Sequence, residues 1–129
     1  MPDILARDVM IKDVHTIAGD SKVAYARLIM LRHNIGALPV VDGNNVVVGI
    51  ITQRDIDLAG EGVSDLLVSD LMTRSLIKAK ETTPLRWIVE KMIKTGIQRI
   101  PVVDEKSKLL GLVTQTCVIK ATLAHDLLK

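Results

Sequence analysis

The chain has 129 residues, with 17 Lys and Arg against 15 Asp and Glu, and a formal charge of +2. Nucleic-acid surfaces need clustered basic residues or several stacking aromatics, and this chain has only Tyr25 and Trp87 as aromatics, so its composition argues against a nucleic-acid partner. Hydrophobic residues make up 48% of the chain, which predicts a globular fold rather than disorder.

No membrane segment, secretory leader or metal motif is visible in the sequence. The longest apolar run, Val46–Ile51, has the length of a strand, whereas a membrane helix needs roughly 18 apolar residues. Cys117 is the single cysteine, which excludes an intrachain disulfide, and His15, His33 and His125 have no metal-ligand spacing. We therefore expect a soluble cytoplasmic protein with neither a membrane association nor a metal site.

An internal repeat dominates the sequence. At an offset of 62 residues the two halves align without a gap, at turn, cap and core positions together. The matching segments are Asp8-Val9-Met10 with Asp70-Leu71-Met72, Ile35–Asp42 with Ile97–Asp104, and Gly49–Gln53 with Gly111–Gln115. We therefore divide the chain into repeats 1–62 and 63–129, with Gly60–Asp65 as the connector.

Each repeat is predicted to have a short helical lead-in followed by β-α-β-β-α. The first repeat would contain a lead-in at Leu5–Met10, a strand at Val14–Ile17, a helix capped by Ser21, strands at Leu38–Val41 and Val46–Ile51 around the turn 42–45, and a helix from about Thr52. The second would contain a lead-in at Leu66–Met72, a strand at Leu76–Ala79, a helix capped by Thr83 with Pro84 at its first position, a hairpin with its turn at 104–108, and a helix from about Thr114.

The predicted fold class is α/β, of an α+β-like kind. A single repeat of about 60 residues would bury too little of its surface to be stable alone. We therefore expect the two β-α-β-β-α repeats to form one joint folding unit, packed about a pseudo-two-fold axis.

These motifs resemble the CBS domain family, and the whole chain resembles a tandem CBS pair, or Bateman module. The resemblance is carried by the lead-in Asp-Val/Leu-Met, by the strand Leu/Ile-Pro-Val-Val-Asp and by Gly-Ile-Ile-Thr-Gln-Arg-Asp, and it extends from Ile4 to Leu123. It implies a non-catalytic regulatory module that binds an adenine nucleotide or a related adenosyl compound in a cleft between the repeats.

The junction at Thr52 and Asp55 can be interpreted in two ways from the residues alone. A strand that leads into a helix presents free N–H groups to an anion, and the Asp55 carboxylate suits the two hydroxyls of a ribose. The same Thr-x-x-Asp pattern is also typical of a capping box, in which Asp55 only closes the first helical turn. The two roles are compatible for Thr52.

The resemblance implies a main cleft in which Arg99 contacts phosphate, as the fork of a guanidinium can, although a solvated surface arginine is the alternative. The backbone of Leu76 and Ile77 would face the adenine edge, and Ile50 would form an apolar wall. The full set for this cleft is Ile50, Thr52, Asp55, Leu76, Ile77 and Arg99.

The resemblance implies a second cleft that lacks both anchors. Its residues would be Val14, His15, Ala37 and Thr114. Ala37 stands at the position of Arg99, and Cys117 stands at the position of Asp55, where a thiol cannot hold a diol as a carboxylate can. We expect this cleft to bind weakly or to stay empty, with Cys117 a small buried hydrophobic residue.

The leading hypothesis is therefore a sensor without catalytic activity or catalytic cofactor, regulated by AMP, ADP or ATP. It would form a homodimer and act on a regulated protein that the sequence does not identify. The alternative is a structural dimerisation or protein-interaction module with vestigial clefts. An enzyme finds no support, because the sequence has no nucleophile–base pair, no Gly-rich phosphate loop and no metal-ligand set.

Overall fold

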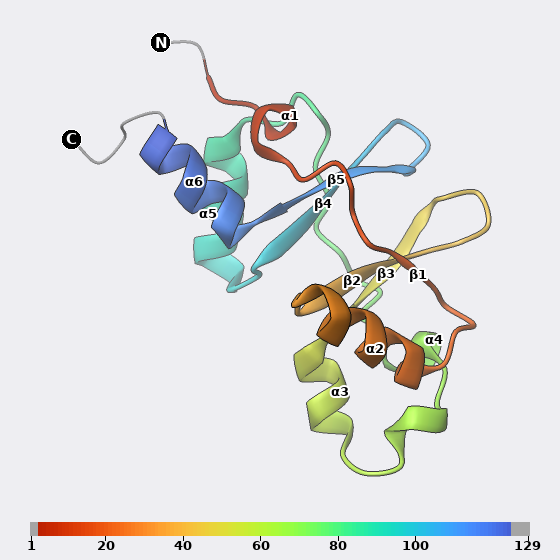
Figure 1. Cartoon of the computed structure of the whole chain (residues 1–129). Helices are drawn as coiled ribbons and strands as arrows, with labels where there is room; N and C mark the ends of the chain where they lie inside the picture. Colours follow the sequence, from red (N-terminus) through yellow and green to blue (C-terminus); the bar gives the residue numbers. More distant parts are fainter. Residues whose placement is uncertain (1–2, 125–129) are drawn as a thin grey trace. The chain divides into compact units, whose positions relative to one another are not determined.

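The computed structural model describes residues 3–124, which fall into two compact units. The middle unit comprises residues 14–76, and the terminal unit combines the start of the chain, up to residue 13, with the part from residue 77 onward (Figure 1). The compact units thus differ from the sequence repeats 1–62 and 63–129, because each repeat's lead-in belongs to the unit built by the other repeat.

Both units are mixed α/β structures of the predicted kind. The middle unit contains β1 (Ile17–Ala18), α2 (Val23–His33), β2 (Ala37–Val41), β3 (Val47–Thr52), α3 (Gln53–Ala59), the 3₁₀ turn η1 (Val63–Asp65) and α4 (Val68–Leu71). The terminal unit contains α1 (Ala6–Val9), α5 (Leu85–Thr95), β4 (Arg99–Val103), β5 (Leu109–Thr114) and α6 (Gln115–Ala124). The lead-in helices, both hairpins and the helices after Thr52 and Thr114 are therefore confirmed.

The strand predicted first in each repeat is much shorter than expected. Only Ile17 and Ala18 pair with β2, in parallel, and in the terminal unit Ala79 alone bridges to Val102 of β4. The predictions of strands at Val14–Ile17 and Leu76–Ala79 were wrong in extent. Residues 14–16 and 76–78 make no strand pairs in the described structure, and the chain turns directly after the paired residues, with hydrogen bonds from Ser21 N to Ala18 O and from Thr83 N to Lys80 O.

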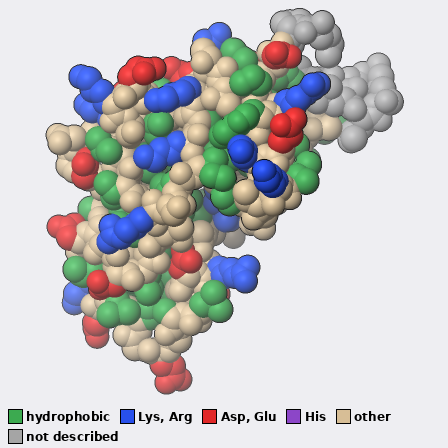
Figure 2. Space-filling view, turned by 180° about the vertical axis from the view of Figure 1, so that it is seen from behind, with side chains coloured by type: hydrophobic (Ala, Val, Ile, Leu, Met, Phe, Trp, Pro, Cys, Tyr) green, Lys and Arg blue, Asp and Glu red, His purple; other side chains and the backbone are tan. Residues whose placement is uncertain are grey.

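The surface mixes charges with scattered apolar side chains. On the face drawn in Figure 2, acidic and basic side chains are interspersed. Large exposed hydrophobic residues occur on helices of both units, for example Leu31 on α2, Leu58 on α3 and Ile93 on α5. Within residues 3–124, the helices are all too short or too polar to cross a bilayer.

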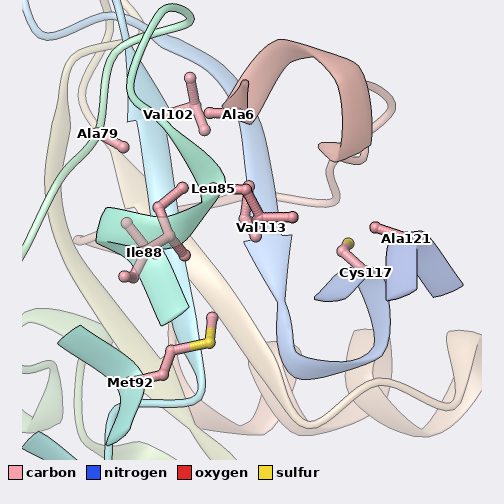
Figure 3. Packing of buried hydrophobic residues seen from close by; sticks show 10 residues of the cluster. Ala6, Ala79, Leu85, Ile88, Met92, Val102, Val113, Cys117 and Ala121 are labelled. Carbon is pink, nitrogen blue, oxygen red and sulfur yellow. The ribbon is translucent and has the colours of Figure 1, made fainter. Parts of the chain in front are cut away.

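Each unit has its own apolar core on the helix-covered face of its sheet. In the middle unit, Val23 and Met30 of α2 and Ile56 of α3 pack with Leu38 and Ile51 of the hairpin. In the terminal unit the equivalent cluster draws on α5, β4, β5 and α6, and it also includes Ala6 from α1 (Figure 3). The core of each unit is therefore completed by a lead-in from the other sequence repeat.

The lead-ins also supply the N-caps of the long helices. The first N–H of α5, on Leu85, donates to the carbonyl of Ile4 at 2.8 Å, and that of α2, on Val23, donates to the carbonyl of Leu66 at 2.8 Å. The predicted side-chain caps at Ser21 and Thr83 were wrong, because α2 and α5 are preceded by Lys22 and Pro84 and have no side-chain cap. A backbone carbonyl already satisfies the N–H group that a cap would serve.

Two glycines allow the lead-ins to lie directly on the hairpin strands. A Cβ at Gly111 would lie 2.6 Å from the sulfur of Met10 and 2.8 Å from the carbonyl oxygen of Ile11. A Cβ at Gly49 would lie 2.7 Å from the sulfur of Met72. Beside Gly111, Ile11 and Leu112 exchange two backbone hydrogen bonds of 2.9 and 3.0 Å. The repeated Met and Gly of the sequence motifs are therefore contact partners.

The two hairpin turns use the same backbone conformation with different residues. The positive φ falls on Asn45 in the first turn, at 64°, and on Ser107 in the second, at 63°. The glycine of the first turn, Gly43, is not at this position. An aspartate organises each turn, since Oδ1 of Asp42 accepts from Asn44 N and Val46 N, and Oδ1 of Asp104 accepts from Lys106 N and Lys108 N.

Substitution Gly111→Ala should test the lead-in contact. We expect it to lower the free energy of unfolding by about 1–3 kcal/mol, as overpacking of a tight site does, measured by urea denaturation. The double variant with Met10→Ala should recover only part of the loss, because the Ile11 carbonyl still opposes the new Cβ. Gly43→Ala is the control, since nothing lies within 4 Å of a Cβ there. Equal stability of both single variants would contradict the close approach.

The Asp104 turn predicts a pH dependence of stability. The backbone hydrogen bond from Lys108 is the main cause that lowers the pKa of the Asp104 carboxyl, with Lys106 N–H and the charges of Lys108 and Lys80 adding to it. The ionised carboxylate therefore stabilises the fold above the pKa of the unfolded chain, and this contribution is lost as the pH falls through the lower folded pKa.

Asp104→Asn keeps the acceptor oxygen and removes the charge. We expect it to reduce stability at pH 7 and to lose this difference from the wild type as the pH falls below about 4, in denaturation series across pH. Glu105→Gln removes the same charge from the adjacent residue and is the control. A stability difference that is constant across the series would refute the interpretation.

Candidate functional site

Three of the expected site residues lie on the face of the middle unit's sheet that points away from its apolar cluster. Strand alternation places Leu38 and Ile51 in the apolar cluster, so Ala37, Ile50 and Thr52 share the opposite face. Ala37 lies directly opposite Thr52 in the strand register. In the terminal unit Arg99 lies opposite Thr114 in the same way, so the repeats place equivalent residues at equivalent positions.

The junction at Thr52 forms a complete capping box. Asp55 N donates to Thr52 Oγ1 at 3.1 Å, and Thr52 N donates to Asp55 Oδ2 at 2.9 Å. Both residues are half-buried. The capping interpretation is thus confirmed, and it leaves a free acceptor, because Asp55 Oδ1 has no hydrogen-bond partner among residues 3–124. The carboxylate can therefore close the helix with one oxygen and accept from a ligand with the other.

At the equivalent junction of the terminal unit, the Cys117 thiol takes the place of the Asp55 carboxylate. Cys117 N donates to Thr114 Oγ1 at 3.2 Å, the Thr114 hydroxyl donates to Cys117 Sγ at 3.3 Å, and the thiol lies 3.9 Å from the Leu112 carbonyl. Cys117 is buried in the apolar cluster of the terminal unit, with Ala121 beside it on α6 (Figure 3). Its expected role as a small buried hydrophobic residue is confirmed, and no carboxylate is available at this junction.

Arg99 is an unpaired cation at the start of β4. It is half-buried, and burial lowers the pKa of its guanidinium. In the described part of the chain the guanidinium makes neither a hydrogen bond nor an ion pair, although the backbone of Arg99 belongs to the β4–β5 ladder. A partly desolvated guanidinium without a protein partner can bind an external anion, and a phosphate fits its planar fork.

The structure distributes the expected site residues over both units. Of the main set, Ile50, Thr52, Asp55 and Leu76 belong to the middle unit, and Ile77 and Arg99 belong to the terminal unit. Of the second set, Val14, His15 and Ala37 belong to the middle unit, and Thr114 belongs to the terminal unit. Ile77 packs against the apolar cluster of the terminal unit.

A contact between two histidines could not be seen in the sequence. The rings of His15 and His33 are stacked, with their centroids 3.8 Å apart and their planes at 19°. They lie 18 positions apart in the chain, and no periodic pattern connects a segment before β1 with the end of α2. His125 lies outside the described residues. Between residues 3 and 124, the side chains that could hold a metal ion do not gather in groups of three or more.

A cavity of about 330 Å³ lies in the terminal unit, between α1 and α6. The sequence analysis assigned Thr114 to a different cleft and Cys117 to the core, and it did not predict a role for the charged residues Asp8 and Lys120. The lining residues are Asp8, Val9, Ile11, Thr114, Thr116, Cys117, Lys120, Ala121 and Ala124. One face of α6 contains Cys117, Lys120, Ala121 and Ala124, because these residues have helical spacing. This spacing is the feature of the sequence from which the α6 side of the cavity could have been predicted.

The chain resembles part of two archaeal enzymes from Methanocaldococcus jannaschii. It is 36% identical over 115 residues to an inosine-5'-monophosphate dehydrogenase, covering 89% of this chain and 23% of the enzyme. It is 35% identical over 113 residues to an L-aspartate semialdehyde sulfurtransferase, covering 88% of this chain and 22% of the enzyme. The chain thus spans less than a quarter of the length of these relatives, and the part of it that they resemble consists of its CBS matches.

Solved CBS structures share the fold over nearly the full length. The CBS domain pair of protein MJ0100, in complex with 5'-methylthioadenosine and S-adenosyl-L-methionine, has a TM-score of 0.87 and 32% identity, covering 96% of this chain and 99% of that one. CBSX2 in complex with AMP has a TM-score of 0.86 and 26% identity, covering 95% and 98%.

The family comparison agrees with the repeat seen in the sequence. The CBS domain matches residues 6–61 and again residues 68–124. These two matches correspond to the two halves that align at the offset of 62 residues. The chain therefore belongs to the CBS domain family and consists of two consecutive CBS repeats.

Proposed function

We propose that the chain is a non-catalytic regulatory module that binds one adenine nucleotide, AMP, ADP or ATP. The observation that carries this proposal is the free Oδ1 of Asp55, which is half-buried at a strand–helix junction while Oδ2 holds the helix cap. A carboxylate fixed in this way can accept hydrogen bonds from both hydroxyls of a ribose without any rearrangement of the helix.

Arg99 extends the proposal from an adenosyl compound to a nucleotide. The ligands solved with similar CBS pairs, AMP, 5'-methylthioadenosine and S-adenosyl-L-methionine, share an adenosyl group, and AMP alone carries a phosphate. An unpaired guanidinium favours a phosphorylated ligand over the other two. In this proposal Ile50 supplies an apolar wall, and the backbone of Leu76 and Ile77 faces the adenine edge.

The second set of residues is proposed to bind an adenine nucleotide weakly at best. Ala37 offers no cation, Cys117 offers no carboxylate, and Thr114 Oγ1 is already engaged by Cys117. Val14 and His15 complete this set, and the imidazole of His15 is stacked on His33. We therefore propose a stoichiometry of one nucleotide per chain.

The nucleotide would regulate the protein by binding one of its conformations more tightly than another. A ligand shifts a conformational equilibrium only as far as it binds one state more tightly than the other. We propose that the nucleotide acts in this way on a homodimer of the chain, whose state is detected by a regulated protein.

Calorimetric titration with AMP, ADP, ATP and S-adenosyl-L-methionine tests this function. We expect Asp55→Asn to weaken every ligand of the panel by about 1–3 kcal/mol, because the charge-assisted bonds to the ribose are lost, while the amide oxygen still caps α3. Arg99→Ala should weaken only the phosphorylated ligands. Asp70→Asn is the matched control, since the Asp70 carboxylate accepts from Leu67 N at 3.0 Å and closes α4 in the same way.

Two results would refute the proposal. One is the absence of binding by the wild type at millimolar concentrations across the panel. The other is an equal effect of Asp55→Asn and Asp70→Asn, which would reduce Asp55 to a helix cap.

A dimerisation and protein-interaction role is the second candidate, and α2 favours it. Leu31 is 80% exposed, Tyr25 54% and Leu28 48%, so three large apolar or aromatic side chains of this helix are accessible to a partner. We expect Leu31→Glu to raise the dimer dissociation constant at least about tenfold, since a charge would be buried in the interface, as measured by analytical ultracentrifugation. Ser75→Glu adds the same charge outside α2 and should leave the dimer intact. A wild type that stays monomeric would contradict this role.

A further inference from the structure

The cavity between α1 and α6 differs in chemistry from the nucleotide-binding junction of the middle unit. At the equivalent positions of α3, the middle unit has Arg54, Asp55 and Leu58, whereas α6 has Thr116, Cys117 and Lys120. The start of α6 therefore lacks the carboxylate that would bind a ribose, and the ammonium group of Lys120 lies about one helical turn further along this helix. This cavity is therefore suited to a carboxylate rather than to a nucleoside diol.

Lys120 is available to a ligand. Within residues 3–124 the single ion pair joins Lys22 to Asp65, so the Lys120 ammonium has no carboxylate partner there. The hydroxyl of Thr116, which also lines the cavity, has no hydrogen-bond partner among the same residues. An ammonium and a hydroxyl on one wall can together bind the two oxygens of a carboxylate.

Asp8 supplies the opposite charge from α1. Its Oδ2 accepts from Leu5 N at 2.8 Å and closes the lead-in helix, and its Oδ1 has no partner in the described structure. Asp8 and Lys120 line one cavity without forming an ion pair of 4 Å or less, and both side chains are exposed, so both charged groups are accessible to a ligand. The same cavity also has apolar lining residues, among them Val9, Ile11 and Ala121.

We propose that this cavity binds a free α-amino acid with an apolar side chain. The carboxylate of the ligand would lie on Lys120 and Thr116, its ammonium on Asp8, and its side chain on the apolar wall. The volume of about 330 Å³ lies at the small end of the roughly 300–1,000 Å³ typical of ligand pockets, which agrees with a compact ligand. Asp55 and Arg99 of the proposed nucleotide site do not line this cavity, which shares Thr114 with the second, weaker set of residues.

Calorimetry of the full chain with L-leucine and two analogues tests the proposal. One analogue, 4-methylpentanoate, lacks the ammonium group, and the other, 3-methylbutylamine, lacks the carboxylate. We expect leucine to bind and each analogue to bind at least about tenfold more weakly, because each loses one charged partner. Absence of leucine binding at millimolar concentration, or equal binding of either analogue, would overturn the proposal.

Two variants assign the charges to their partners. Lys120→Met should weaken leucine but not 3-methylbutylamine, since the amine makes no use of Lys120. Asp8→Asn keeps the cap acceptor for Leu5 N and should weaken leucine but not 4-methylpentanoate. Lys94→Met on α5 and Asp70→Asn on α4 are the matched controls. Leucine binding that is unchanged in both cavity variants would place the ligand elsewhere and refute the site.

The nucleotide proposal can fail independently of this one. Asp55→Asn and Arg99→Ala should leave leucine binding unchanged, and Lys120→Met should leave nucleotide binding unchanged. If Asp55→Asn or Arg99→Ala abolished leucine binding, leucine would be occupying the nucleotide site and the separate cavity site would be refuted.

Discussion

The close approach of each lead-in to the hairpin strand of the other sequence repeat is the contact on which the structure depends. It requires glycine at 49 and 111, since a Cβ there would meet the sulfur of Met72 or Met10. With the lead-ins in place, the carbonyls of Leu66 and Ile4 satisfy the first N–H groups of α2 and α5. Neither sequence repeat contains all the groups that its own sheet and long helix need, so the tandem arrangement follows from hydrogen bonding as well as from buried area.

The two strand–helix junctions share one backbone arrangement and differ in side-chain chemistry. Thr52 and Thr114 both accept from the residue three positions later, so the helix start is preserved in both units. In the middle unit that residue is an aspartate, which retains one free oxygen after capping. In the terminal unit it is a cysteine that joins the apolar core. Substitution at one capping position therefore changes the available ligand chemistry and leaves the backbone of the helix start intact.

The proposed ligands follow from this divergence. Asp55 and the unpaired Arg99 present the charges that a nucleotide needs, a carboxylate for the ribose and a guanidinium for the phosphate. Asp8 and Lys120 present opposite charges to another cavity, which suits a zwitterion. A regulatory module that binds both kinds of ligand could respond to nucleotide and amino-acid levels together, and the two ligands would be coupled only through a shared conformational equilibrium.

The sequence by itself determined the repeat, the lead-in helices, both hairpins and the junction at Thr52 and Asp55, because these depend on local periodicity, turn residues and hydrogen bonds three residues apart. Only the tertiary structure decided which repeat each lead-in completes, how α2 and α5 are capped, and that His15 stacks on His33. It also brought Asp8 and Lys120 to one cavity. The caps come from backbone carbonyls, which every residue has, and the other contacts join residues far apart in the chain, so no local pattern of side chains could encode them.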